Sequence, residues 1–551
     1  MAGGLLNLIA TGSQNLILNG NPQKTFWSST HKSYTNFGLQ NFRLDYEGLR
    51  QMQLAASTVF TFKVKRYADL LMDMWLVVQL PDIYSPIAAP LDFEFGRWLP
   101  YEFRWIRNLG AMMIETIRFT IGGALIQQIT GHQIVVLANR DLTADQKAKW
   151  DEAVGNVPDL YDPGNGVYPH ATQADAEPSI RGREIYVPIP VWWGLTPQQA
   201  FPLTSLQYNE MQVEITLRPI YELFQIREFA SPYERIAPNP NNAQHRFHRF
   251  LQPPTNASLD YASLGVSWNE NIHLSCTYCF LSDDETKVFA LYPQQYLIKE
   301  LYETRFPNIP ATGKAWLQNS TGLVTGWSIF LQRSDVALRN EWSNYTAWPF
   351  QEKPSPAVRA GLTMADSPVP NEYEFTNGAS VINVPAGTLG YGLNPDGSLT
   401  DFFSSGAYTA TNERDILLTL GITFDGATRE EVRSASTFRY QQPYLASPGK
   451  GLVGLYCYNF CLNTSPFVLQ PSGAINLGKY SKIELEFATI SPPFNPEAAA
   501  YTICDPETLA AVGVSKQNTN IYTYNFDLVV IEERYNVLTF MSGNAALMEA
   551  R

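Results

Sequence analysis

The five cysteines are the residues whose spacing most resembles a metal site. Two pairs stand out, Cys276-x-x-Cys279 and Cys457-x-x-x-Cys461, and Cys504 is left over. Structural zinc usually takes such pairs from tight turns, whereas both pairs lie in runs typical of β-strands. Residues three apart in a strand face opposite sides, so Cys276 and Cys279 should diverge. We therefore expect buried or half-buried thiols, with neither a zinc site nor a disulfide framework.

Two acidic clusters could hold a metal or support acid–base chemistry. Asp283, Asp284 and Glu285 could form a carboxylate site, but the solvated end of a strand explains them better. Glu532-Glu533 stands at a comparable place later in the chain, which indicates a recurring acidic turn.

The histidines offer one further candidate, His245-x-x-His248, which could bind a metal or a polyanion. Its neighbours favour a surface loop instead. The chain has only 6 His, no Ser-His-Asp set stands out, and no phosphate-cradling glycine loop occurs. Gly122-Gly123 is typical of a hairpin turn. We predict no catalytic, cofactor-binding or metal-binding residue.

Four Asn-x-Ser/Thr sequons occur, at Asn256, Asn319, Asn344 and Asn463. They matter only where lumenal glycosylation machinery reaches them. The opening residues lack the basic region of a signal peptide, and no apolar run approaches the ~18 residues that span a bilayer. We therefore expect folding in the cytosol, no membrane insertion and no conventional use of these sequons.

Length and composition favour a large all-β protein. With 551 residues the chain should form two or more domains, because single cores rarely grow beyond about 300 residues. It is 45% hydrophobic, 13% aromatic and only 17% charged, and its 37 Pro and 36 Gly supply many turns. The net charge of −13 argues against a protein that wraps nucleic acid.

Short strand-like segments recur throughout the chain. Many alternate between apolar and polar residues, which is the pattern of a half-buried strand. The predicted strands are 70–80, 114–121, 185–191, 211–217, 273–281, 327–331, 416–424, 452–461, 482–490 and 525–531.

These strands fall into two sets that resemble one another in the same order. Trp75 and Trp327 open the two sets, and Val213–Leu217 resembles Ile483–Phe487. Each match is weak alone, but the shared order predicts a duplicated domain of about 250 residues. The remaining matches are Ile117–Gly122 with Ile416–Gly421, Ile185-Tyr186 with Leu455-Tyr456, and Tyr278–Leu281 with Leu528–Ile531.

Each copy holds about eight strands, which favours a two-sheet jelly roll over an immunoglobulin-like sandwich of about 100 residues. Long insertions separate the strands at 141–183, 221–271 and 348–411. The first should contain a helix, with Thr143 as N-cap and Gln146 completing a capping box. Loops of this length usually carry contacts or function.

Motifs across most of the chain resemble those of the major capsid proteins of nucleocytoplasmic large DNA viruses. The opening is the strongest match, with Ala2–Leu6, Leu18–Phe26 and Tyr34–Phe37. Two departures, Trp27–Ser29 and the long 348–411 loop, leave the virus group open. The other matches are Phe280–Glu285 with Tyr296–Ile298, Gln470–Asn476, and Tyr535–Gly543.

The resemblance implies a double jelly roll and a structural rather than enzymatic role. The ordered internal repeat places the first jelly roll at 25–292 and the second at 300–551, with a linker at 293–299 and an arm at 1–24. The resemblance also implies homotrimers that act as pseudo-hexagonal capsomers of an icosahedral virion shell. Neighbouring capsomers and minor capsid proteins would be the partners, and no nucleic acid would be bound directly.

The resemblance further implies synthesis and assembly in the host cytoplasm. Relatives that infect algae are glycosylated at atypical sites, so covalent glycans stay open. A jelly-roll glycan-binding protein, lectin-like or fibre-like, is the alternative, although it would not need the N-terminal motif. A cupin-type enzyme would need a histidine cluster, which the sequence lacks.

Overall fold

The computed structural model consists mainly of antiparallel β-sheets. No helix in the part of the chain it describes is long and apolar enough to cross a bilayer. The described residues are 2–84, 101–161, 178–228, 236–242, 245–252, 267–347, 380–381, 389–393, 399–403, 415–490, 501–504, 511–515 and 524–549.

The first half of the chain forms two sheets with strand orders β1-β11-β3-β7 and β2-β9-β5-β6. All of the pairings are antiparallel, and β8 adds to β3 outside the main order. The strands are β1 Gly38–Leu44, β2 Thr58–Lys63, β3 Leu70–Gln79, β5 Ile114–Ile121, β6 Ala124–Thr130, β7 Glu184–Pro188, β8 Phe201–Pro202, β9 Met211–Leu217 and β11 His273–Phe280.

The second half repeats this arrangement strand for strand. Its sheets have the orders β12-β25-β14-β20 and β13-β22-β18-β19, with β21 and β26 added at the side. The strands are β12 Gln294–Ile309, β13 Thr312–Trp316, β14 Leu323–Arg333, β18 Leu417–Phe424, β19 Ala427–Ser434, β20 Leu455–Asn459, β21 Ile475–Asn476, β22 Ile483–Thr489, β25 Phe526–Met541 and β26 Asn544–Leu547.

Two sheets of this order, packed face to face, make a jelly roll, so the chain is a double jelly roll. The predicted repeat is confirmed at the level of strands, and Trp75 and Trp327 occupy equivalent strands, β3 and β14. The predicted residue alignment of β9 with β22, which matched Val213 to Ile483, is offset by two residues. Ile121 at the end of β5 pairs with Met211, whereas Phe424 at the end of β18 pairs with Ile483. The offset is even, which keeps the inward-facing residues in phase.

Each jelly roll encloses its own apolar core, in which alternate residues of facing strands meet. Phe60, Ile117 and Val213 belong to the first core, and Trp327 and Leu485 to the second. These side chains are fully buried, as the period of two along each strand requires.

The strands β12 and β25 are unusually long and reach from one core to the other. Leu528 and Val530 of β25 lie in the second core, whereas Leu538 and Phe540 lie in the first, together with Ile298 of β12. The predicted linker 293–299 therefore carries strand rather than loop structure, since β12 begins at Gln294.

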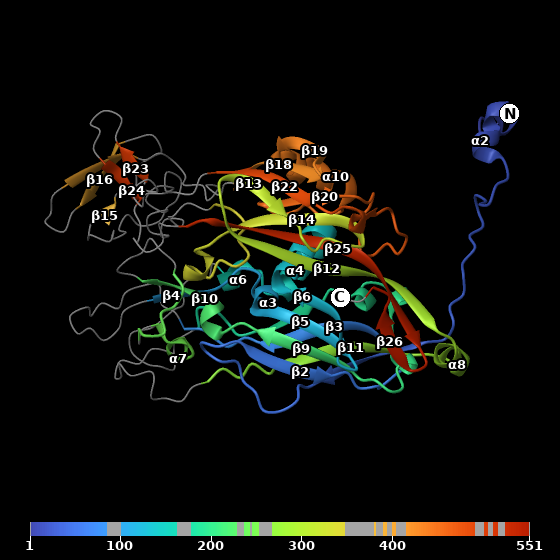
Figure 1. The fold of residues 1–551 in the computed structure, drawn as a ribbon, viewed down its shortest axis with the longest axis horizontal. Coiled ribbons are helices and arrows are strands. Elements are labelled where there is room, and N and C mark those ends of the chain that lie inside the picture. The colour runs from blue at the N-terminus through green and yellow to red at the C-terminus, as the bar shows by residue number, and fades with distance from the viewer. Residues whose placement is uncertain are drawn as a thin grey trace.

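The long connections of both jelly rolls leave from one end of the subunit. Since the strands alternate in direction, the connections 80–113, 131–183, 218–272, 334–416, 435–454 and 490–525 all start at the same end of their sheets. Figure 1 shows this end on the left, marked by the small strands β4, β10, β15, β16, β23 and β24. These extra strands, with β17, are β4 Tyr101–Trp105, β10 Phe224–Glu228, β15 Ser380–Val381, β16 Leu389–Leu393, β17 Leu399–Phe403, β23 Tyr501–Cys504 and β24 Ala511–Ser515.

The helices are short and lie in the connections. The helix predicted after Thr143 is confirmed as α5, whose Gln146 N–H donates to the Thr143 hydroxyl. The α-helices that the structure describes in the body are α3 Leu109–Met113, α4 Gly131–Asp141, α5 Ala144–Ala153, α6 Pro158–Tyr161, α7 Phe247–Phe250, α8 Asp283–Leu291 and α10 Gln442–Ala446. A π-helical turn, η11, at Thr437–Gln441 precedes α10.

Opposite the long connections, the turn between β5 and β6 is tight. Gly122 and Gly123 join β5 to β6 with φ of 56° and 85°, so the predicted hairpin turn is confirmed. This left-handed conformation favours glycine, and a Cβ on Gly122 would also lie 2.7 Å from the Asn209 side chain.

We predict that Gly122→Val lowers the free energy of unfolding by about 1–3 kcal/mol, because a β-branched residue is strained at positive φ. Thermal unfolding of the purified protein would measure the loss. Gly12→Val is the matched control, since Gly12 is extended and an added Cβ there meets nothing within 4 Å. Equal midpoints for the two variants would contradict the prediction.

Candidate functional site: the junction between the two jelly rolls

The helix α4 lies between the two jelly rolls and contacts both (Figure 1). It begins with a capping box, in which Thr130 and Gln133 exchange hydrogen bonds between side chain and backbone. Ile134 and Val135 join the first core, whereas Val136 packs in a separate cluster with residues of the second jelly roll such as Phe330. Nearly all its residues are buried, as expected of a helix enclosed on every side.

A buried charge network closes the C-terminal end of α4. The Arg140 guanidinium donates to both carboxylate oxygens of Asp141, at 2.9 and 2.6 Å, and to Glu533 of β25. A third nitrogen donates to the Ser328 hydroxyl of β14 at 3.2 Å. The Thr464 hydroxyl donates to Asp141 at 2.9 Å, so the network joins α4 to three segments of the second jelly roll.

The electrostatics of this network follow from burial and pairing. Burial alone would raise the pKa of Glu533, but Arg140 and Lys299 outweigh it and hold that pKa below its ordinary value. Burial raises the pKa of Asp141 despite the attraction of Arg140. Two carboxyl groups thus share one guanidinium, with the Lys299 ammonium 3.9 Å from Glu533.

The backbone end of α4 is held by the second jelly roll as well. Gly449 donates its N–H to the carbonyl of Arg140, and Gly451 donates to that of Asn139, both at 2.9 Å. A Cβ on Gly449 would lie 2.5 Å from each of these carbonyl oxygens, so only glycine permits the approach. Helix-end carbonyls that lack an intrahelical partner are thereby satisfied.

A buried histidine marks the other end of α4. A hydrogen bond of 3.0 Å joins Nδ1 of His132 to the Tyr345 hydroxyl. Burial, reinforced by Arg218 and Arg305, lowers the pKa of His132 to about 3, so the imidazole is neutral. Next to it, the Thr130 hydroxyl donates to Glu303 of β12 at 2.8 Å.

A second polar contact joins the two halves nearer the insertions. Arg104 of β4 forms an ion pair of 2.9 Å with Glu341, which also accepts from Gln225 of β10. Burial would raise the pKa of Glu341, but Arg104 and neighbouring arginines hold it below its ordinary value. The side chain of Arg218 stacks on Trp342, with 4.3 Å to the ring centroid.

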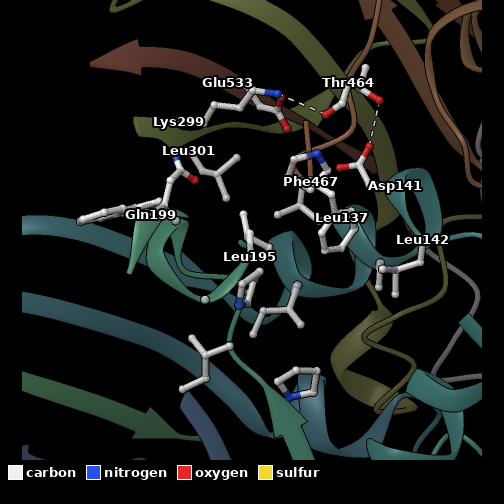
Figure 2. A pocket seen from close by; sticks show the side chains of 18 of the residues that line it. Leu137, Asp141, Leu142, Leu195, Gln199, Lys299, Leu301, Thr464, Phe467 and Glu533 are labelled. Atoms are coloured by element: carbon white, nitrogen blue, oxygen red, sulfur yellow. Dashed lines mark hydrogen bonds and ion pairs between the residues drawn. The ribbon is translucent and has the colours of Figure 1, made fainter. Parts of the chain in front are cut away.

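Beside α4 lies a cavity of about 230 Å³, lined by residues of both jelly rolls. Figure 2 shows Asp141, Thr464, Lys299 and Glu533 grouped along one wall of it. The other walls are mainly apolar, and residues such as Leu137, Leu142, Leu195, Leu301 and Phe467 line them.

The cysteines are placed as predicted where their side chains are described. Cys276 belongs to the first core, whereas Cys279 packs in a separate cluster on the other face of β11. These two, Cys457 and Cys461 are buried free thiols, and burial raises the pKa of each. The side chain of Cys504 lies outside the described residues.

The predictions for the acidic clusters were half right. Asp283 and Asp284 are solvent-exposed, but they open helix α8 directly after β11. The acidic turn predicted at Glu532-Glu533 was wrong, because both residues lie inside β25 and are buried. Glu533 instead accepts from Arg140, and Glu532 accepts from the Trp327 indole at 2.8 Å.

The surface loop predicted for His245 and His248 was also wrong. His245 is buried, and its Nδ1 accepts from the backbone N–H of Asn239 at 3.0 Å. His248 is half-buried in α7, where Phe247 and Phe250 enter the first core. The sequence did contain an indication of this burial, because Phe247 and Phe250 are large apolar residues that hold the segment against the core.

The predicted sequons lie in different settings. Asn319 and Asn463 are exposed, while the Asn344 carboxamide accepts from the Thr346 hydroxyl at 2.7 Å. Asn256 lies outside the described residues. Among the residues that the structure describes, no group of three or more His, Cys, Asp or Glu is placed to hold a metal.

Two sequence models of known families match this chain. One, described as the major capsid protein N-terminus, matches residues 25–245. The other, described as the large eukaryotic DNA virus major capsid protein, matches residues 331–546. The chain belongs to the major capsid proteins of large eukaryotic DNA viruses.

Similar proteins extend this result over the whole chain. The major capsid proteins of Phaeocystis pouchetii virus and Chrysochromulina ericina virus are 24% and 25% identical to it, and each match covers 99% of both chains. Among solved structures, a chain of the PBCV-1 virus capsid has a TM-score of 0.59 at 19% identity, covering 96% of this chain and 100% of that one. The Faustovirus major capsid protein gives 0.58 at 12%, covering 96% and 94%.

This major capsid protein is thus a structural component of a virion capsid, with the double jelly-roll fold of its neighbours. The charged groups of the junction pair with one another rather than with an open site. The arrangement suits a fixed joint between two building blocks.

We predict that Arg140→Met destabilises the protein by about 3–5 kcal/mol, because it leaves Asp141 and Glu533 buried without their counter-charge. Chemical unfolding of the purified protein would measure the loss. Arg433→Met is the matched control, since its ion pair with Glu430 is on the surface and should be worth about 1 kcal/mol or less. A loss at Arg140 no larger than the control's would refute the role of the network.

We also predict an acid-sensitive junction. The unfolded chain protonates His132 near its ordinary pKa of 6.5, whereas the folded chain does so only near 3. Stability from this residue is therefore lost as the pH falls from about 6.5 toward 3, by a total of about 5 kcal/mol.

His132→Gln keeps a hydrogen-bonding group for the Tyr345 hydroxyl but cannot titrate, so it should flatten this part of the stability–pH curve. His31→Gln, in the exposed segment before β1, is the control and should leave the curve unchanged. Parallel curves for the native protein and His132→Gln would be the contrary result.

Proposed function

We propose that three copies of this major capsid protein form one capsomer with a pseudo-hexagonal outline. Two similar jelly rolls per chain give three copies six similar units around one axis. The observation that carries the proposal is the repeated sheet order of the two jelly rolls, combined with the rigid junction that holds them side by side.

The same arrangement suggests where each segment of the chain lies in the capsomer. We assign residues 1–24 to an arm, 25–292 to the first jelly roll, 293–299 to a linker and 300–551 to the second jelly roll. The long connections lie at one end and the arm starts from the other, where β1 begins. In the shell, the connections would face outward and the arm inward.

The contacts of the capsomer would be made by its sides and its arm. Tyr440, Tyr444 and Leu445 form an exposed apolar group on η11 and α10 of the second jelly roll, which suits a subunit contact. Minor capsid proteins and neighbouring capsomers are the remaining partners. Assembly would take place in the host cytoplasm.

No catalytic step is part of the proposal. The paired charges of the junction support this reading, since a general base or nucleophile needs a group that is free to react. Purified protein should show no hydrolase, transferase or nuclease turnover above a denatured control.

We predict that the full chain is a trimer at micromolar concentration and that deletion of residues 2–24 leaves the trimer intact. The arm contributes no buried residue to either core, so its loss should not affect folding. Shell formation should fail or become irregular, because the exposed apolar arm needs a partner surface.

Native mass spectrometry measures the trimer, and electron microscopy of assembled particles measures the shell. A soluble monomer would overturn the trimer. Normal shells from the truncated chain would overturn the role of the arm and leave the trimer standing.

A further inference from the structure

The N-terminal arm exposes a set of apolar side chains that the body of the chain does not cover. It contains two short helices, α1 Leu5–Ile9 and α2 Leu16–Asn19, with the single-turn η1 Ser13–Asn15 between them. Seven leucines and isoleucines in it are 46% to 87% exposed. Figure 1 shows the arm standing clear of the jelly rolls. Residues 2–23 include no charged side chain.

The junction cavity presents the complementary surface. Around its lining, Leu297, Phe467, Val468 and Leu469 are 39% to 48% exposed, which is unusual for adjacent large apolar residues. The charged lining groups are already engaged, since Lys299 donates to the Thr464 carbonyl at 3.2 Å and pairs with Glu533. The free surface is therefore apolar, which suits a neutral occupant.

The size of the cavity matches a short helical segment. An apolar cavity of about 150 Å³ holds a benzene ring, so about 230 Å³ accommodates roughly two aliphatic side chains. In α1, Leu5, Leu8 and Ile9 are spaced i, i+3, i+4 and so share one helix face. In α2 the apolar residues Leu16, Ile17 and Leu18 are consecutive and point in different directions.

The arm starts from the end of the subunit where the cavity is lined by strand connections. The Thr35 hydroxyl donates to Glu285 at the start of α8, at 2.8 Å, which ties the root of the arm there. The connections 189–210 and 460–482, which contribute Leu195 and Phe467 to the cavity, lie at this same end. Between Thr35 and Leu8 an extended chain spans up to about 90 Å, enough to reach an adjacent molecule.

From this juxtaposition we propose that α1 of one copy docks into the junction cavity of a second copy through the face formed by Leu5, Leu8 and Ile9. Two of these side chains would fill the cavity, and the third would pack on its exposed apolar rim. The mode is a short apolar helix in an apolar groove. The proposal rests on the self-assembly proposed above. In this arrangement, the cavity between the two jelly rolls of one chain binds α1 of a second chain.

A pair of engineered cysteines tests the contact. In assembled particles, Leu8→Cys combined with Val468→Cys should form disulfides between chains on mild oxidation, seen as covalent dimers and longer species on non-reducing denaturing gels. Each single variant controls for the native cysteines, four of which are buried. Leu8→Cys with Val432→Cys is the matched control, since Val432 is 56% exposed on β19, away from the cavity.

A labelling experiment gives an independent readout. Val468→Cys should react with a small thiol reagent at least several-fold more slowly in particles of the full chain than in trimers that lack residues 2–24. Leu5→Ser with Leu8→Ser should restore fast labelling, whereas Leu49→Ser, a matched change at a fully exposed residue between β1 and β2 that does not line the cavity, should not.

The outcomes separate the two proposals. Crosslinks between chains together with slow labelling support docking in a second copy. A crosslink confined to one chain, or no crosslink and no protection, overturns docking, even if native mass spectrometry still finds trimers. A monomer in native mass spectrometry would instead overturn the proposed trimer.

Discussion

Arg140 is a cation buried between two β-sandwiches, and the arrangement of the subunit depends on how its charge is balanced. Removing an ion from water costs several kcal/mol, which pairing repays only when the geometry is close to ideal. Asp141 comes from the same helix, but Glu533 comes from β25 of the other jelly roll. The balance is therefore complete only when the two jelly rolls hold one relative position.

The apolar contacts around this network could not impose that position alone. Hydrophobic burial is non-directional, so Val136 against Phe330 would tolerate sliding. Hydrogen bonds from a planar guanidinium do not tolerate such sliding, because their geometry fixes the positions of their acceptors. The strand β25 adds a second constraint, because it reaches both cores. Its Leu538 and Phe540 are buried in the first core, while its Leu528 is buried in the second.

Much of this fold could be predicted from the sequence because jelly-roll strands obey a period of two. The bounds of β5 and β9 match the predicted strands, and the order of the repeated segments identified the duplication. Residue alignment between the copies was less secure, because an even offset preserves the apolar pattern. The family resemblance added the architecture that pattern alone left open.

The junction could not be predicted, for a physical reason. The acids at Glu532-Glu533 read as a solvated turn because charged residues are rarely buried, and the partner Arg140 is distant in the sequence. One signal was available: the run from Ile134 to Ala138 is apolar on all sides, which marks a fully enclosed helix. Arg140-Asp141 directly after it would then be expected to need a buried partner.

A rigid junction also explains why one chain should carry two jelly rolls. In the proposed trimer, contacts within a chain alternate with contacts between chains around the ring. If the two jelly rolls of one chain could move relative to one another, capsomers would differ in outline. Such capsomers could not tile flat facets. Contacts between chains can adjust as subunits meet, but the contact within the chain is set on folding. Placing the buried charges at Arg140 and Glu533 therefore fixes half of the ring's contacts before assembly begins.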